Sequence, residues 1–213
     1  MGVFLGLDLG QRADYSALIG LERVVRTERV RNLLTYGWDV TRDQRLGLVM
    51  AERIPLGTPY PEVVKRAAKV AKECAGLGQC SLAVDVTGVG AAVWDLLREQ
   101  DVGKCRLMPV VMTGGLQEHW SEGRYCVPKP DLVAGVVRAM EEGRLYAAKG
   151  VGLDDLVREM RGFGVKLSGR GREGFEGKKD DLVMALCLAV WASGKAGVGE
   201  GDVLQPGTPV ALW

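Results

Sequence analysis

Acidic residues stand at three points where the chain is otherwise apolar. Asp8 lies in the run GVFLGLDLG and Asp85 in the run SLAVDVTG, and both runs have the pattern of buried β-strands. Asp180 and Asp181 directly precede LVMALCLAVW, the most apolar helical run of the chain. A carboxylate inside an apolar strand costs free energy unless it is paired, hydrogen-bonded or bound to a cation. The pattern therefore indicates a site at which these acids act together.

The chemistry that such acids support is metal-dependent hydrolysis. Hard oxygen ligands suit Mg²⁺ or Mn²⁺, and two such ions about 3.5–4 Å apart can activate a water and stabilise the leaving oxygen in phosphodiester cleavage. Gly6 and Ala83, two positions before the strand acids, leave room on the same strand face for a helix end or a cation. The structural alternative is that each acid caps a turn, and that Asp180 and Asp181 complement the helix dipole. We expect the Asp180–Asp181 pair both to begin the helix and to bind metal.

The spacing of apolar residues predicts a mixed β-sheet with helices packed on it, an α/β layered domain. Three strands at hairpin distances predict an antiparallel start. Residues 41–59 are expected to be a loop, and the glycines from Gly162 to Gly177 punctuate a predicted short hairpin. The expected strands are 2–10, 17–24, 31–40, 81–88 and 105–115, and the expected helices are 59–75, 91–99, 129–143, 151–163 and about 180–193.

Composition narrows the class of protein. Hydrophobic residues make up 47% of the 213 residues and charged residues 26%, as in soluble packed proteins. No apolar run reaches the roughly 18 residues that a membrane helix needs, and the start MGVFLGLDLG lacks the basic segment of a signal peptide. The five cysteines form no C-x-x-C pair, which favours reduced thiols and a cytoplasmic protein. A net charge of +1 means that any nucleic-acid binding must rest on local patches.

Five blocks of the sequence, taken in order, resemble the nuclease domain of phage large terminase subunits. The blocks are LGLDLGQRADYSALIGLER, LAVDVTGVGAAVWDLL, PVVMTGG, VPKPDLVAGVVRAMEEGRL and KKDDLVMALCLAVW, which together extend over nearly the whole chain. The resemblance implies an RNase H-like mixed sheet flanked by helices. It also implies a metal-dependent endonuclease that cuts concatemeric viral double-stranded DNA during genome packaging, in the cytoplasm of the host.

The resemblance also implies which residues form the site. The family's ligands lie on the first strand, on the central strand and at the start of the last helix, which here are Asp8, Asp85 and Asp181. These three are the expected catalytic residues and ligands of two Mg²⁺ or Mn²⁺ ions. Asp180 is expected as a fourth carboxylate, and Asp14, in GQRADYS, matches a further family acid near the site.

A full large terminase also carries an ATPase motor, but this sequence contains no G-x-x-x-x-G-K-[ST] motif. The chain is therefore expected to be either an excised nuclease domain or a free-standing relative. Its expected partners are double-stranded DNA, the ATPase domain or other packaging-motor subunits, and the portal, with no membrane. Residues 1–193 are expected to form the nuclease domain, and residues 194–213 a flexible tail rich in glycine and proline.

A basic, glycine-rich segment leads directly into the Asp180–Asp181 pair. Glycine lets the backbone approach a phosphate closely and cations neutralise the phosphate, so this segment is a candidate DNA-binding surface; the alternative is a solvated hairpin. No helix-turn-helix or zinc finger that would read bases is present. The candidate DNA-binding residues are Arg161, Lys166, Arg170, Arg172, Lys178 and Lys179, with Lys129 and Arg124 as further basic residues.

Three other classes compete with this interpretation. GLDLGQRADYS and VDVTGVG also resemble the phosphate loops of the actin and sugar-kinase ATPases, but that group needs two such domains and has no use for the acids of DDLVMAL. A Holliday-junction resolvase would have the same acids and similar chemistry. An inactive DNA-binding module would have no need to bury four acids. His119, the only histidine, is expected in a loop without a catalytic role.

Overall fold

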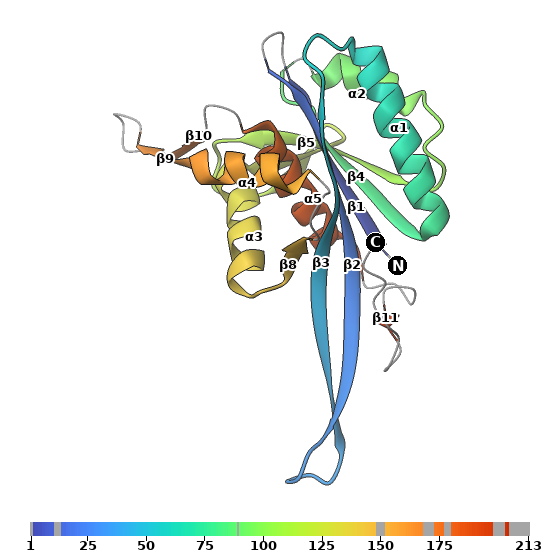
Figure 1. Ribbon diagram of the computed structural model, residues 1–213, viewed down its shortest axis with the longest axis vertical. Coiled ribbons are helices and arrows are strands. Elements are labelled where there is room, and N and C mark those ends of the chain that lie inside the picture. Colours follow the sequence, from blue (N-terminus) through green and yellow to red (C-terminus); the bar gives the residue numbers. More distant parts are fainter. Residues whose placement is uncertain are drawn as a thin grey trace.

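A mixed β-sheet forms the centre of the fold (Figure 1). The computed structural model describes residues 2–10, 14–88, 90–147, 152–167, 173–176, 180–197 and 203–204. Among these residues the strand order across the sheet is β6-β7-β5-β4-β1-β2-β3-β8, and a ninth strand, β11, pairs with β2. The strands are β1 (Gly2–Asp8), β2 (Ser16–Arg31), β3 (Trp38–Ile54), β4 (Gln79–Asp85), β5 (Arg106–Thr113), β6 (His119–Ser121), β7 (Arg124–Pro128), β8 (Leu145–Ala147) and β11 (Val203–Leu204).

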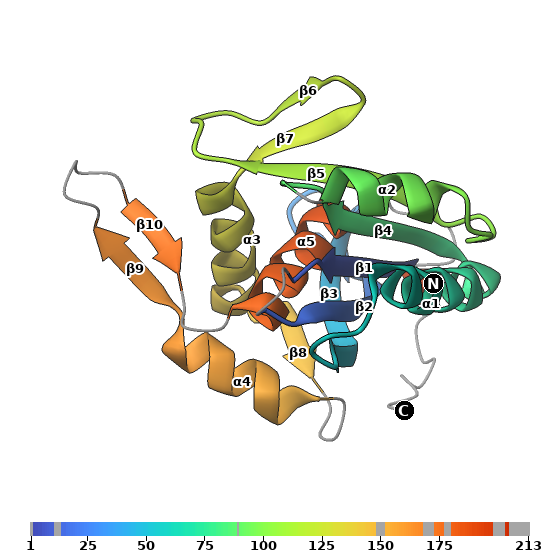
Figure 2. The same cartoon turned by 90° about the horizontal axis from the view of Figure 1, so that it is seen from above.

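Helices cover both faces of this sheet and enclose two apolar cores (Figure 2). One core lies between the sheet and α5, α3 and α4, and the other lies between the sheet and α1 and α2. This arrangement confirms the predicted α/β class. The helices are α1 (Tyr60–Leu77), α2 (Gly90–Arg98), α3 (Lys129–Glu141), α4 (Leu153–Gly162) and α5 (Asp181–Lys195), each close to its predicted range.

The first three strands pair in the predicted antiparallel order, β1 with β2 and β2 with β3. The predicted third strand was nevertheless misplaced, because residues 41–54 form strand rather than loop and β3 runs from Trp38 to Ile54. Backbone pairing with β2 continues along this whole length, from Arg31 opposite Trp38 to Ser16 opposite Ile54. The predicted loop is reduced to the segment around Pro55, Gly57 and Pro59, before α1.

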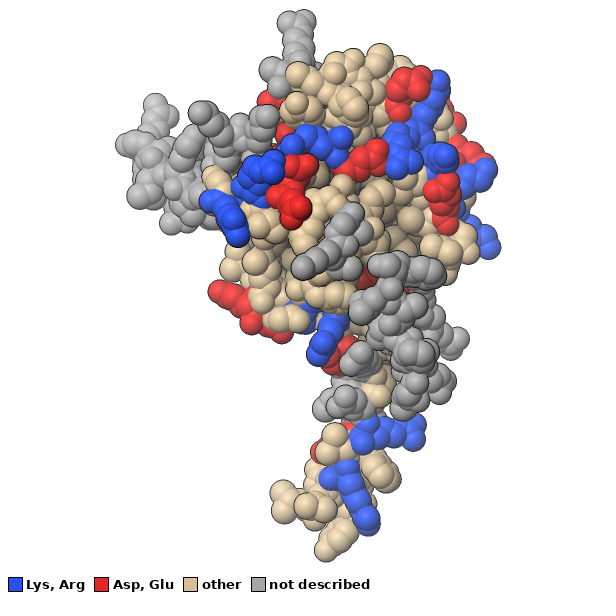
Figure 3. Space-filling view, in the orientation of Figure 1, with Lys and Arg blue, Asp and Glu red and all other residues tan. Residues whose placement is uncertain are grey.

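The distal half of β2 and β3 projects from the body as a two-stranded ribbon (Figure 1). Large apolar side chains near its tip are exposed to solvent, among them Leu33, Leu34, Tyr36 and Trp38. Figure 3 shows basic side chains along this ribbon, whereas acidic and basic side chains are interspersed over the visible face of the body. Both faces of the ribbon meet water, so its sequence lacks the apolar alternation of a strand that packs on one face.

Parallel strands make up the other half of the sheet. β4 pairs with β1 on one side and with β5 on the other, and β5 pairs with β7, all in parallel. The carboxyl ends of β1 and β4 therefore lie side by side at one edge, and each strand ends in an aspartate, Asp8 and Asp85. The short strands β6, β7 and β8 were not predicted, and His119 begins β6 instead of lying in a loop.

The predicted glycine-rich hairpin is present as a separate two-stranded sheet. It consists of β9 (Gly164–Leu167) and β10 (Glu173–Glu176), which pair antiparallel just before α5. Figure 2 shows that it projects away from the main sheet beyond α3 and α4.

The carboxyl end of the fold is held by a buried arginine. α5 continues two residues past the expected domain end, to Lys195. Arg23 in β2, 1% exposed, donates hydrogen bonds to the carbonyl oxygens of Ser193, Ala196 and Gly197. Most of the predicted tail lies outside the described residues. No helix in the part of the chain that the structure describes is both long and apolar enough to cross a bilayer.

Candidate metal centre

The site begins where α5 crosses β1. A Cβ atom on Gly6 would collide with the carbonyl oxygen of Ala185 and with the backbone nitrogen of Ala189, so α5 rests directly on the strand backbone. Gly6 and Asp8 point to the same face of β1, because side chains alternate along a strand. Asp181 lies one helical turn before Ala185. The close contact at Gly6 therefore brings the start of α5 to the end of the strand that carries Asp8.

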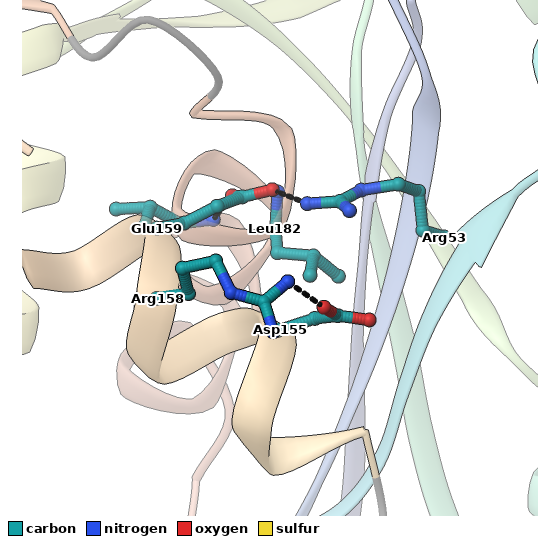
Figure 4. Close-up of polar contacts among 6 residues, drawn as sticks. Arg53, Asp155, Arg158, Glu159 and Leu182 are labelled. Atoms are coloured by element: carbon teal, nitrogen blue, oxygen red, sulfur yellow. Dashed lines mark hydrogen bonds and ion pairs between the residues drawn. The ribbon is translucent and has the colours of Figure 1, made fainter. Parts of the chain in front are cut away.

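The first turn of α5 is capped by a residue from another helix. Asp180 is the N-cap residue, yet its side chain makes no capping hydrogen bond. Instead, a carboxylate oxygen of Glu159 in α4 accepts hydrogen bonds from the backbone N–H groups of Leu182 (2.8 Å) and Val183 (3.3 Å). Figure 4 shows Glu159 between Leu182 and Arg53 of β3, to which it is also ion-paired. The carboxylates of Asp180 and Asp181 are therefore not used to cap their own helix.

The acids expected to bind metal influence one another electrostatically. Burial raises the pKa of Asp8 well above its usual value, and the charges of Asp85, Asp181 and Asp180 raise it further, in that order. Residues from β1, β4 and α5, separated by up to 173 positions in the sequence, thus share one electrostatic environment. Like charges gathered in this way are costly unless protons or cations compensate them.

Asp181 is buried, with 7% of its surface exposed. Burial is the main cause that raises its pKa to about 6, and the charges of Glu159, Asp14 and Asp180 add to the effect, whereas Arg53 opposes it. Asp14 itself is exposed and lines a surface pocket together with Gly10 and Ser16. The structure thus brings Asp14 near Asp181.

Asp85 has a structural role in addition to its place beside Asp8. Its Oδ1 accepts hydrogen bonds from the backbone N–H of Thr87 (2.8 Å) and from the Thr87 hydroxyl (2.5 Å). The Thr87 hydroxyl oxygen in turn accepts a hydrogen bond from the backbone N–H of Met112 (3.0 Å). Burial nevertheless raises the pKa of Asp85, while these hydrogen bonds and Lys129 lower it. The alternative of a turn cap is therefore realised at Asp85 through one carboxylate oxygen.

Lys129, the first residue of α3, contributes a positive charge among the acids. Its ammonium nitrogen lies 3.4 Å from Asp180 Oδ2, and its charge lowers the pKa of both Asp8 and Asp85. Lys129 was expected at a DNA-binding surface. Here it lies among the carboxylates, with its side chain 30% exposed.

Only some of the other candidate DNA-binding residues belong to the described part of the chain. Arg161 is exposed in the last turn of α4, and Lys166 lies on β9. Arg170, Arg172, Lys178 and Lys179 lie outside the described residues. Arg124 forms an exposed ion pair with Glu122.

Four aspartates supply the oxygen donors of the expected metal site. Within the described ranges, no three Asp, Glu, His or Cys side chains converge closely enough to hold an ion. Carboxylate oxygens on β1, on β4 and at the start of α5 are donors that suit Mg²⁺ or Mn²⁺, and the buried Cys187 thiol also lies near Asp8 and Asp180. The Asp180 carboxylate is paired with Lys129 instead of facing the other acids. Joint ligation therefore requires these side chains to reorient.

Sequence reasoning missed Glu159 and Arg53. Glu159 lies on the buried side of α4, three positions after Leu156, where the helical pattern calls for an apolar residue. A glutamate at such a position signals a buried polar partner. Arg53 gives no comparable signal, because it was expected in a loop and its partner lies 106 positions away.

Comparisons with known proteins bear on the fold. No protein-family model matches the sequence, and a search of curated proteins finds no match. The large terminase nuclease from thermophilic phage G20c with bound magnesium is similar in structure, with a TM-score of 0.58 and 21% identity over 89% of this chain and 80% of that chain. The large terminase nuclease domain of bacteriophage SPP1 with bound Mn has a TM-score of 0.52 and 13% identity over 91% and 87%.

A terminase nuclease domain from human cytomegalovirus is also similar in structure. The human cytomegalovirus terminase nuclease domain, soaked with Mn, has a TM-score of 0.52 and 11% identity over 88% of this chain and 81% of that chain. This chain therefore has the fold of large terminase nuclease domains, which confirms the predicted mixed sheet with an antiparallel start and parallel strands.

Proposed function

We propose that this chain is the nuclease domain of a phage large terminase and cuts concatemeric double-stranded DNA during genome packaging. The observation that carries the proposal is that the parallel neighbours β1 and β4 end in Asp8 and Asp85, while the close contact of α5 with Gly6 brings the start of α5, with Asp180 and Asp181, to the same end of the sheet. The shared fold with terminase nuclease domains, several of them with bound divalent ions, supports it.

Asp8, Asp85 and Asp181 are the proposed ligands, with Asp180 and Asp14 as additional carboxylates. When bound, two divalent ions supply Lewis-acid stabilisation of the developing charge and a more acidic water. The chain's own residues position these groups, because Gly6 sets the height of α5 above β1 and Thr87 fixes one oxygen of Asp85. Lys129 offsets part of the acidic charge and can donate to a phosphate oxygen that approaches the cluster.

The proposed DNA path runs over the segment before α5. Arg161 lies in the last turn of α4, and the other basic candidates precede Asp180 and Asp181 in the sequence. Contacts of this kind neutralise phosphates and position a duplex without reading its sequence. The ATPase domain, other motor subunits and the portal are the proposed protein partners of this domain.

Incubation of supercoiled plasmid with the protein tests the proposal. We expect nicking and linearisation with Mn²⁺ or Mg²⁺ and none with EDTA. Asp8→Asn, Asp85→Asn and Asp181→Asn should each lower the rate by at least about 100-fold while circular dichroism shows an intact fold. The matched control is Asp101→Asn, because Asp101 is an exposed acid that pairs with Lys72 away from the cluster.

Two outcomes would replace this proposal. Absence of metal-dependent cleavage together with ATP hydrolysis would favour the actin-like alternative. Cleavage restricted to four-way junctions, with linear and supercoiled duplex left intact, would favour a Holliday-junction resolvase.

A further inference from the structure

At the start of α5, the N-cap residue and the residue that caps the helix are two different carboxylates, Asp180 and Glu159. In most helices the N-cap side chain accepts the hydrogen bonds of the free N–H groups in the first turn, and aspartate is among the preferred residues for this role. Here Asp180 occupies the N-cap position but makes no such bond, and its Oδ2 faces Lys129 instead. Glu159 accepts the hydrogen bonds from Leu182 and Val183.

Glu159 is held in place from its other side. Its second carboxylate oxygen is ion-paired with Arg53, near the end of β3, and its side chain is 4% exposed. The Arg53 guanidinium lies 5.2 Å from the centre of the Tyr15 ring, next in sequence to Asp14. Arg53 Nε is buried and has no hydrogen-bond partner among the described residues, so the ion pair with Glu159 is the compensating contact of this guanidinium that the structure shows.

These contacts connect α4, β3 and α5 through a single carboxylate (Figure 4). The neighbouring acid on α4, Asp155, points instead to Arg158 on the same helix, at 2.7 Å, and makes an exposed pair. Of these two acids, Glu159 alone reaches the backbone of α5. The position of the α5 first turn relative to β3 therefore depends on the length and orientation of the Glu159 side chain.

We propose that Glu159 is a positioning residue for the metal ligands at the start of α5, with Arg53 as its anchor. This inference rests on the proposed function, since it concerns the metal affinity of the same carboxylates. By capping α5 from α4, Glu159 takes over the helix-capping role from Asp180 and fixes the first turn, which carries Asp181. Residues that orient metal ligands in this way typically change metal affinity or activity by about 10–100-fold when they are replaced.

Four variants distinguish the effect of the length of the Glu159 side chain from the effect of its charge. Glu159→Gln keeps the length of the side chain and can present its amide oxygen to the N–H groups of Leu182 and Val183. It loses the negative charge, and its amide NH2 group faces Arg53. Glu159→Asp keeps the charge, but it is one methylene too short for the same contacts. Glu159→Ala loses both, and Asp155→Ala is the matched control on the same helix.

The measurement is Mn²⁺ affinity of the full chain by isothermal titration calorimetry, beside plasmid cleavage and thermal unfolding. We expect Glu159→Asp and Glu159→Ala to weaken Mn²⁺ binding by about 10-fold or more, Glu159→Gln by less than about 5-fold, and Asp155→Ala not at all. If Glu159→Ala does not fold, the Mn²⁺ affinities of Glu159→Gln and Glu159→Asp still show whether the length or the charge of the side chain matters.

The results that overturn the inference are distinct from those that overturn the proposed function. Unchanged Mn²⁺ affinity in all Glu159 variants, with only lower thermal stability, would reduce Glu159 to a structural cap. Full affinity in Glu159→Asp with loss in Glu159→Gln would show that charge alone matters. Absence of Mn²⁺ binding and cleavage in the unmodified protein would instead reject the metal-dependent nuclease.

Discussion

The backbone of Ala185 in α5 rests on the α-carbon of Gly6 in β1, with no space for a side chain between them. This contact sets how closely the apolar last helix approaches the sheet. Because Asp181 lies one turn before Ala185 and Asp8 lies two residues after Gly6, the same contact sets how closely the two acids approach each other. The packing of α5 at Gly6 therefore determines the separation of two of the expected metal ligands.

Replacement of Gly6 by alanine should destabilise the fold. The added methyl group would overlap backbone atoms of α5 that cannot move away independently, so we expect the free energy of unfolding to fall by about 2–4 kcal/mol. Gly135→Ala in α3 is the control, because its methyl group would stand 3.8 Å from Val190, an ordinary contact. That substitution should stabilise by about 0.5–1 kcal/mol through helix propensity. Urea unfolding measures both, and equal effects would contradict the close contact.

Stability of the metal-free protein should depend on the ionisation of Asp181. Its pKa is about 6 in the folded protein, against about 3.9 in an unfolded chain. The folded state therefore binds more protons between these values, so stability falls as pH rises from about 4 to about 6, by at most about 3 kcal/mol from this residue.

The substitution Asp181→Asn tests this dependence. Urea unfolding in EDTA at several pH values should show a smaller decrease in stability between pH 4 and 6 than in the unmodified protein. Identical pH dependence in the two proteins would show that Asp181 is not the titrating group.

The basic segment before α5 should contribute to DNA binding. Replacement of Arg170 and Arg172 by alanine should weaken duplex binding and lower the slope of log K against log salt by about 2, if each arginine contacts one phosphate. Lys72→Ala is the control, because Lys72 lies on α1, which packs on the face of the sheet opposite α5, and pairs with Asp101. Fluorescence anisotropy over a salt series measures both, and an unchanged slope in the double variant would remove this segment from the DNA path.

Buried Arg23 should be important for stability. It donates to the carbonyl oxygens of Ser193 (3.1 Å) and Ala196 (2.9 Å) and to Gln79 Oε1 (2.8 Å). Arg23→Met should lower the free energy of unfolding by about 3 kcal/mol, since it removes a buried guanidinium and leaves the buried Ser193 carbonyl and several partly buried acceptors without this donor. Arg158→Ala, which removes an exposed pair, should change it by less than about 0.5 kcal/mol. Similar losses in the two variants would indicate that Arg23 does not anchor the end of α5.

Features of the fold that depend on local pattern could be predicted from the sequence. The apolar strands that carry Asp8 and Asp85 are buried on both faces, and the helix of Asp181 is buried nearly all round, so their sequences are distinctive. The outer half of β3 could not be predicted, because it is held by backbone pairing with β2 in a ribbon exposed on both faces. The strands β6 and β8 have only three residues each, too few for a period to show.

The arrangement of the site could be predicted only in part. Two strand acids followed by a helix that begins with Asp180 and Asp181 suggested a common site; the structure brings the ends of β1 and β4 and the start of α5 together, and the metal-binding role of these acids stays a prediction. The identity of the helix cap could not be predicted, because Glu159 and Leu182 are 23 positions apart and Arg53 is 106 positions from Glu159. The packing of α4 against α5 brings these partners together, and a local sequence pattern does not predict that packing.

Location of bound Mn²⁺ by anomalous scattering, in crystals soaked with manganese, tests most directly whether these aspartates form a metal centre. We expect two ions about 3.5–4 Å apart among Asp8, Asp85 and Asp181, and loss of at least one of them in Asp8→Asn. Manganese bound only elsewhere, or bound at the same place in Asp8→Asn as in the unmodified protein, would contradict the proposed site.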